Sequence, residues 1–127
     1  MPRPKSESLT EVEQRVMEVL WSAESGTVSE VLAAVETPKP LAFNTVQTML
    51  RILEQKGYVR HTEEGRAFRY FPLVNRQQAS RSAVQNVVRR FFGSPGALAL
   101  NLLASEDVTP EELVRIRKLI ADAEKRS

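Results

Sequence analysis

The sequence contains no cysteine and only one histidine, His61. Without cysteine there is no disulfide, no thiolate metal ligand and no thiol nucleophile. One histidine cannot by itself build a zinc site or a catalytic triad, so we interpret His61 as an ordinary strand residue. There is also no glycine-rich phosphate loop. We therefore expect no metal, no cofactor and no enzymatic activity.

Long hydrophobic runs are absent as well. No apolar stretch approaches the roughly 20 residues of a membrane-spanning helix, and residues 1–7 lack the apolar centre of a signal peptide. We expect a soluble cytoplasmic protein without membrane insertion. A chain of 127 residues corresponds to one domain, or to a small domain with an appendage.

Positive charge is concentrated in the middle of the chain. Residues 1–37 carry three Lys or Arg against seven Glu, residues 38–90 carry ten against three, and residues 91–127 carry five against six acidic residues. Chance clustering is one interpretation, and a surface that faces a polyanion is the other, favoured one. Arg3 and Lys5 belong to a predicted short N-terminal arm that could also touch phosphate.

Two capping boxes predict the first two helices. Thr10 with Glu13 opens a core helix, and Thr27 with Glu30 opens a short support helix from Val28 to about Glu36. Two prolines in residues 37–40 stop the second helix, because proline cannot donate a backbone hydrogen bond and restricts the residue before it.

The most informative pattern lies in residues 43–57. Apolar residues recur at the spacing of one helical face, namely Val46, Met49, Leu50 and Leu53. The opposite face carries Asn44, Gln47, Thr48, Arg51 and Gln55. Amides, hydroxyls and a guanidinium suit the edges of DNA bases, although a merely hydrated surface is the alternative. With Asn44 as N-cap and Gly57 as the terminating glycine, we predict a helix over 45–56.

The periodicity changes after Gly57. Residues 58–63 and 67–72 are rich in β-branched and aromatic side chains and predict a hairpin joined by residues 64–66. A basic hairpin directly after two closely connected helices is typical of a winged helix-turn-helix. We expect Arg60, Arg66 and Arg69 to reach backbone phosphates, with Arg51 on the preceding helix.

Three further helices are predicted after the hairpin. Asn75 caps a helix over about 76–92 that Gly93 ends, Ser94 and Pro95 begin a second, and a last helix follows residue 109. Residues 97–104 are apolar nearly all round and need cover from every side. Either they fold back on the wing domain, or a second copy of the chain covers them, which we favour.

The predicted fold is therefore mostly α with a small β-hairpin. Residues 1–74 form a winged helix-turn-helix DNA-binding domain, and residues 75–127 form a helical dimerisation domain. The residues expected at the dimer interface are Phe91, Leu98, Leu100, Leu102, Leu103, Leu113, Ile116 and Ile120.

This order of segments resembles the penicillinase repressor (BlaI/MecI) family of bacterial transcriptional regulators over essentially the whole chain. The segments that carry the resemblance are Leu9-Thr10-Glu11-Val12-Glu13, Thr27-Val28-Ser29-Glu30-Val31, Asn44-Thr45-Val46-Gln47-Thr48-Met49-Leu50, Lys56-Gly57-Tyr58-Val59, Gly65-Arg66-Ala67-Phe68-Arg69-Tyr70, and Phe91-Phe92-Gly93 followed by Leu98-Ala99-Leu100-Asn101.

The resemblance implies a homodimeric repressor that occupies a palindromic operator in double-stranded DNA and regulates genes of the antibiotic-resistance or stress type. By position, it implies operator contacts from the start of the predicted 45–56 helix and from the wing at Gly65 and Arg66. The contacts at the helix start are assigned to Asn44, Thr45, Gln47 and Thr48. A winged-helix adaptor that binds another protein, without sequence-specific DNA binding, is the alternative function.

Two positions depart from the family pattern. Ile52 stands where the family usually has Arg, with Arg51 beside it. In family members cleaved by a membrane sensor protease, the cleaved bond follows Asn and precedes Phe, whereas here Asn101 precedes Leu102. Such a protease is a possible partner, but we favour Asn101 as a residue that fixes register at an apolar interface.

Overall fold

Both predicted capping boxes are present in the computed structural model, which describes residues 8–127. The predicted arm with Arg3 and Lys5 lies outside the described residues. Helix α1 (Glu11–Ala23) begins after Thr10, and α2 (Val28–Ala34) begins after Thr27. In each, the threonine hydroxyl accepts from the third helical N–H and the glutamate there accepts from the threonine N–H. Local sequence therefore fixes both helix starts.

Helix α3 (Phe43–Lys56) begins earlier than the sequence predicts. We predicted Asn44 as its N-cap, but Asn44 lies inside the helix and Ala42 occupies the cap position without a side-chain hydrogen bond. The N–H groups of Thr45 and Val46 both approach the Ala42 carbonyl, at 3.1 Å, so the backbone closes the first turn without a side-chain cap. Gly57 ends the helix as predicted, because its φ of 90° is left-handed.

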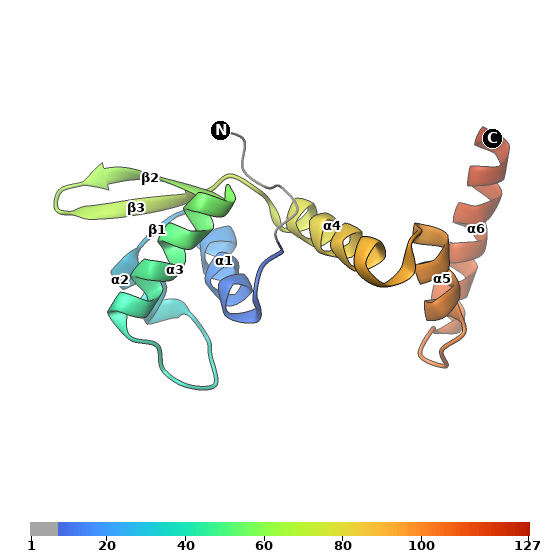
Figure 1. Cartoon of the computed structure of the whole chain (residues 1–127), viewed down its shortest axis with the longest axis horizontal. Coiled ribbons are helices and arrows are strands. Elements are labelled where there is room, and N and C mark those ends of the chain that lie inside the picture. Colours follow the sequence, from blue (N-terminus) through green and yellow to red (C-terminus); the bar gives the residue numbers. More distant parts are fainter. Residues whose placement is uncertain (1–7) are drawn as a thin grey trace. The chain divides into compact units, whose positions relative to one another are not determined.

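The predicted hairpin belongs to a three-stranded antiparallel sheet. Strands β2 (Val59–Glu64) and β3 (Ala67–Pro72) pair directly, and the two-residue β1 (Gly26–Thr27) pairs with the other edge of β3. The sequence predicts no strand at Gly26 and Thr27, because two residues are too short for a strand pattern. In Figure 1 the β2–β3 hairpin projects from the cluster of α1, α2 and α3.

One hydrophobic core joins these elements. Its most deeply buried side chains come from all three helices and the sheet, and they are Val16, Met17, Leu20, Val31, Val46, Leu50, Leu53, Val59 and Tyr70. The apolar stripe predicted for α3 supplies three of them, whereas Met49 is only partly buried against the core. The polar stripe of α3 therefore has to face away from the core.

Helix α4 (Arg76–Val87) packs on the winged-helix unit. The Trp21 indole donates to the Val74 carbonyl at 2.8 Å, Arg76 pairs with Glu18, and Ala79 is buried. Asn75 caps the helix reciprocally with Gln78. The chain consequently divides after Val87, later than the predicted boundary at residue 74, because α4 is held on α1 by these side-chain contacts.

The second unit, Val88–Ser127, contains η1 (Val88–Phe92), α5 (Pro95–Leu103) and α6 (Pro110–Arg126). The predicted helix over 76–92 is thus not α-helical throughout, since η1 is a π-helical turn in which the Gly93 N–H donates to the Val88 carbonyl at 2.7 Å. Ser94 caps α5, and a capping box of Thr109 and Glu112 opens α6. Within residues 8–127, no helix combines the length and the apolarity needed to cross a bilayer.

Candidate nucleic-acid interface

A pocket of about 300 Å³ lies between α3 and the wing. Its lining comes from the start of α2, from α3 and from β3 with the preceding turn, and comprises Thr27, Val28, Ser29, Phe43, Gln47, Arg51, Arg66, Ala67, Phe68 and Tyr70. The structure thereby brings together Gln47, Arg51 and Arg66, three residues predicted to contact DNA. A concave surface with an amide and two guanidinium groups can receive a polyanion that also offers hydrogen-bonding edges.

The predicted reading face of α3 is on the surface. Asn44, Thr45, Thr48 and Arg51 are exposed, and Gln47 is half-buried at the pocket wall. Within residues 8–127 their side chains make no hydrogen bond or ion pair to the rest of the chain. Their donors and acceptors are therefore free for a ligand. The uncapped first turn of α3 adds backbone N–H groups at the same end of the helix.

The three wing arginines differ in their surroundings. Arg66 is exposed in the turn beside Gly65, whose φ of 62° is left-handed. Arg60 is also exposed, and its guanidinium lies 4.4 Å from the centre of the Phe71 ring. Since successive strand residues point to opposite faces, Arg60 and Phe71 lie on the face of the hairpin away from the α3 pocket.

Arg69 is held by acidic partners. Its guanidinium donates to Glu64 at 2.8 and 3.0 Å, to Glu30 at 3.0 and 3.1 Å, and to the Ser25 hydroxyl at 3.1 Å. These five hydrogen bonds equal the number of guanidinium N–H groups. We predicted a phosphate contact for Arg69, but the structure commits this side chain to joining the wing to α2.

The same network shifts the ionisation of its members. Hydrogen bonding to Arg69 lowers the pKa of Glu30 and the pKa of Glu64, and the two carboxylates raise the pKa of Arg69. Sequence reasoning missed this network because Arg69 and Glu30 are far apart in the chain. The available signal was the position of Glu30 in a capping box next to a strand.

His61 connects the wing to the end of α3. Its Nδ1 atom lies 2.8 Å from both carboxylate oxygens of Glu54, and its ring stacks on Phe68 with 4.2 Å between ring centres. Tyr70 packs beside them, and burial raises the pKa of its phenol, so the hydroxyl stays protonated. Among the described residues no three His, Asp or Glu side chains gather into a metal-binding group.

A largely buried ion pair joins α3 to α1. The Lys56 ammonium donates to the Glu13 carboxylate at 2.7 Å and to the Ser8 carbonyl at 3.2 Å. The two side chains are only 14% and 6% exposed, and Glu13 also accepts from the Thr10 N–H. This contact anchors the end of α3 on the first capping box and thus orients the polar face of the helix.

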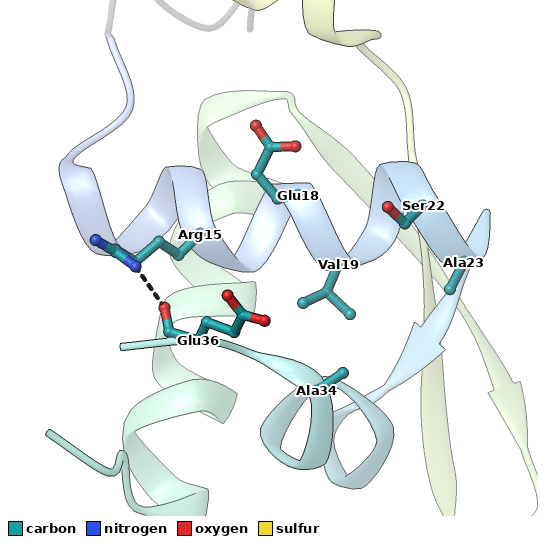
Figure 2. A pocket seen from close by; sticks show the side chains of 7 residues that line it. All are labelled: Arg15, Glu18, Val19, Ser22, Ala23, Ala34 and Glu36. Atoms are coloured by element: carbon teal, nitrogen blue, oxygen red, sulfur yellow. Dashed lines mark hydrogen bonds between the residues drawn. The ribbon is translucent and has the colours of Figure 1, made fainter. Parts of the chain in front are cut away.

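A second pocket, of about 410 Å³, contains none of the residues predicted to function. It lies between α1 and the end of α2, and Figure 2 shows the Arg15 guanidinium bonded to the Glu36 carbonyl at its edge. Glu18, also in this pocket, is paired with Arg76, and that contact lowers the pKa of Glu18. Its charged groups are largely engaged within the chain.

The second unit carries the residues predicted for dimerisation. No residue of α5 or α6 is buried. Phe91 and Leu100 are each 72% exposed, Leu102, Leu103 and Ile120 are also exposed, and Leu98, Leu113 and Ile116 are half-buried. Asn101 is exposed on α5 together with Leu102. The unit therefore has a large apolar surface that its own helices do not cover.

Comparison with known proteins identifies the family. The penicillinase repressor family model matches residues 9–122. The chain is 27% identical to the penicillinase repressor of Bacillus licheniformis over 123 residues, 96% of each chain. It is 30% identical to the transcriptional regulator BlaI of Mycobacterium tuberculosis over 117 residues, 91% of this chain and 85% of that protein.

A solved structure agrees with the fold. The solution structure of the DNA-binding domain of the repressor BlaI matches with a TM-score of 0.52 and 30% identity, and the match covers 61% of this chain and 93% of that domain. The winged helix is therefore shown by both sequence and structure. The chain belongs to the penicillinase repressor family of DNA-binding transcriptional repressors.

Proposed function

We propose that the protein is a cytoplasmic homodimeric repressor that reads a palindromic operator with the polar face of α3. The observation that carries the proposal is that Asn44, Gln47, Thr48 and Arg51 have no side-chain partners within residues 8–127, on a helix whose other face forms the core. An unpaired amide pair and a hydroxyl on one helix match the donors and acceptors of base edges in the major groove.

Each contact has a distinct role in this proposal. Asn44, Gln47 and Thr48 read base edges, with Thr45 beside them at the helix start. Arg51 and Arg66 contact phosphates on either side of the pocket that they line. Arg60 packs on Phe71 on the hairpin face that points away from the α3 pocket, so it can contact only a phosphate that lies past the edge of the hairpin. Arg69 contributes indirectly, because it holds the wing on α2.

The second unit supplies the dimer contacts. An apolar surface that is not covered within its own unit is expected to be buried by a second copy, and a two-fold dimer matches a palindrome. We place Asn101 at this interface, where its amide would bond across the two-fold axis. Cleavage of the Asn101–Leu102 bond by a membrane sensor protease stays a prediction, as does control of resistance or stress genes.

The experiment that tests the proposal selects bound fragments from a random pool of duplex DNA with the full-length protein. We expect an enriched palindrome whose half-sites lie about one helical turn, or a multiple of it, apart. Binding should weaken about 10³- to 10⁵-fold between about 50 and 200 mM salt if the dimer contacts six to ten phosphates. Enrichment of a single half-site would count against the dimer. No enrichment at all would favour a protein-binding adaptor.

A further inference from the structure

Phe43 is a large apolar side chain left open at the first position of α3. It is 44% exposed, it lines the pocket between α3 and the wing, and it lies one helical turn before Gln47. Residues four apart share a helix face, so Phe43 and Gln47 point to the same side of α3. The sequence analysis assigned Phe43 no role.

The core does not account for this position. The buried face of α3 is formed by Val46, Leu50 and Leu53, and Phe43 is not part of that cluster. Phe68, the other exposed aromatic residue of the pocket, already stacks on His61. Within residues 8–127, Phe43 has no aromatic ring contact and no cation above its ring. Its free edge is thus available to a ligand.

We propose that Phe43 is a specificity residue that contacts the C5-methyl group of a thymine in the major groove. The inference rests on the proposed function and extends it. Among the base edges of the major groove, thymine alone offers a methyl group, and phenylalanine is one of the side chains that contact it. Arg51 and Arg66 line the same pocket as Phe43, so the apolar ring lies between basic side chains that can bind duplex DNA.

The helix geometry relates this thymine to the base read by Gln47. Cβ atoms four residues apart on a helix are separated by about 5 to 6 Å. Base pairs are stacked about 3.4 Å apart along the duplex. This separation corresponds to roughly 1.5 to 1.8 base-pair steps, so Phe43 and Gln47 address base pairs one or two steps apart in each half-site.

The experiment replaces each thymine of the selected operator by deoxyuridine, one at a time. Deoxyuridine pairs like thymidine but lacks the methyl group. We expect one position in each half-site where this replacement weakens wild-type binding about fourfold, the value of one buried methyl group. Phe43→Ala should bind the thymine operator less tightly and should lose the difference between thymine and deoxyuridine at that position only.

Two variants separate this role from a structural one. Phe43→Leu keeps an apolar side chain and should retain part of the difference between the two bases. Gln47→Ala should weaken binding but leave the difference at the Phe43 position intact. A purely structural loss in Phe43→Ala would weaken both operators equally, so the ratio of the two affinities reports the contact even if the variant is less stable.

Three results would overturn the assignment. The wild type could bind every deoxyuridine operator as tightly as the thymine operator, Phe43→Ala could keep the full thymine preference, or Gln47→Ala could abolish that preference. These outcomes leave the proposed function standing, because the protein still selects an operator. If the wild type selects no DNA at all, the proposed function fails first and this inference falls with it.

Discussion

The guanidinium of Arg69 on β3 donates to both carboxylate oxygens of Glu30 on α2, at 3.0 and 3.1 Å. Glu30 is at the same time the capping glutamate of α2, where it accepts from the Thr27 N–H. One carboxylate therefore starts the support helix and holds the wing strand. Glu64 completes the arrangement from β2. Charged groups at the protein surface therefore join the wing to α2.

This network predicts a pH dependence of wing stability. Arg69 lowers the pKa of Glu30 and of Glu64 below their ordinary value of 4.5, so the folded state binds fewer protons than the unfolded state. The stabilisation is present above about pH 4.5 and is lost as the pH falls through the lowered pKa values. We expect the double variant Glu30→Gln with Glu64→Gln to have a lower melting temperature than the wild type at neutral pH. Its melting temperature should also fall less than that of the wild type as the pH is lowered, and thermal unfolding at several pH values measures both.

The control for this measurement is Glu63→Gln, which removes an exposed carboxylate of β2 for which the structure shows no ion pair among residues 8–127. The melting temperature of this variant should depend on pH as that of the wild type does. If the melting temperatures of the wild type and the double variant fell equally as the pH was lowered, a stabilising role for the Arg69 network would be contradicted.

Alanine substitutions at Gln47 and Arg66 should affect DNA binding in different ways. Gln47→Ala is expected to cost about 1 to 3 kcal/mol on the selected operator and to relax the preference at one base pair, because a base-edge contact is lost. Arg66→Ala should weaken binding to all sequences alike. It should also reduce the slope of log affinity against log salt concentration by about two, because each protomer of the dimer loses one phosphate contact. Gel shifts at several salt concentrations measure both. A uniform loss from Gln47→Ala would remove its base-reading role.

The Lys56–Glu13 pair should contribute substantially to stability. Lys56→Met keeps the apolar stem but leaves the carboxylate of Glu13 buried without its cation. We expect a loss of about 2 to 4 kcal/mol in urea unfolding, less than for a fully buried pair because the Thr10 N–H still donates to Glu13. Lys39→Met, at an exposed position, is the control. Adding Glu13→Gln to Lys56→Met removes the unpaired charge and should recover part of the lost free energy of unfolding. A further loss of stability in the double variant would contradict this explanation.

Leu100 tests the dimer. It is 72% exposed on α5, and Leu100→Asp places a charge on a surface that we expect to be buried between two copies. Sedimentation velocity should show a dimer for the wild type and a monomer for the variant at the same concentration. Leu73→Asp, at an exposed leucine of the first unit, should leave the dimer intact. A monomeric wild type at all concentrations would exclude the proposed arrangement of the operator complex.

What the sequence by itself determined was local. Capping boxes at Thr10, Thr27 and Thr109, the terminating Gly57 and the turn at Gly65 act between residues a few positions apart, so their patterns can be read directly. The amphipathic stripe of α3 is local in the same sense. It predicted which residues face the core and which face away from it.

What only the tertiary structure decided were contacts between distant segments. These contacts join residues far apart in the chain: the pairing of β1 with β3, the bonds of Arg69 to Glu30, the Lys56–Glu13 pair and the hydrogen bond of Trp21 to the Val74 carbonyl before α4. Exposed arginines and arginines held by acidic partners look alike in a sequence. Only the folded chain distinguishes Arg66, which is exposed and has no hydrogen bond or ion pair within residues 8–127, from Arg69, whose donors are all used within the protein.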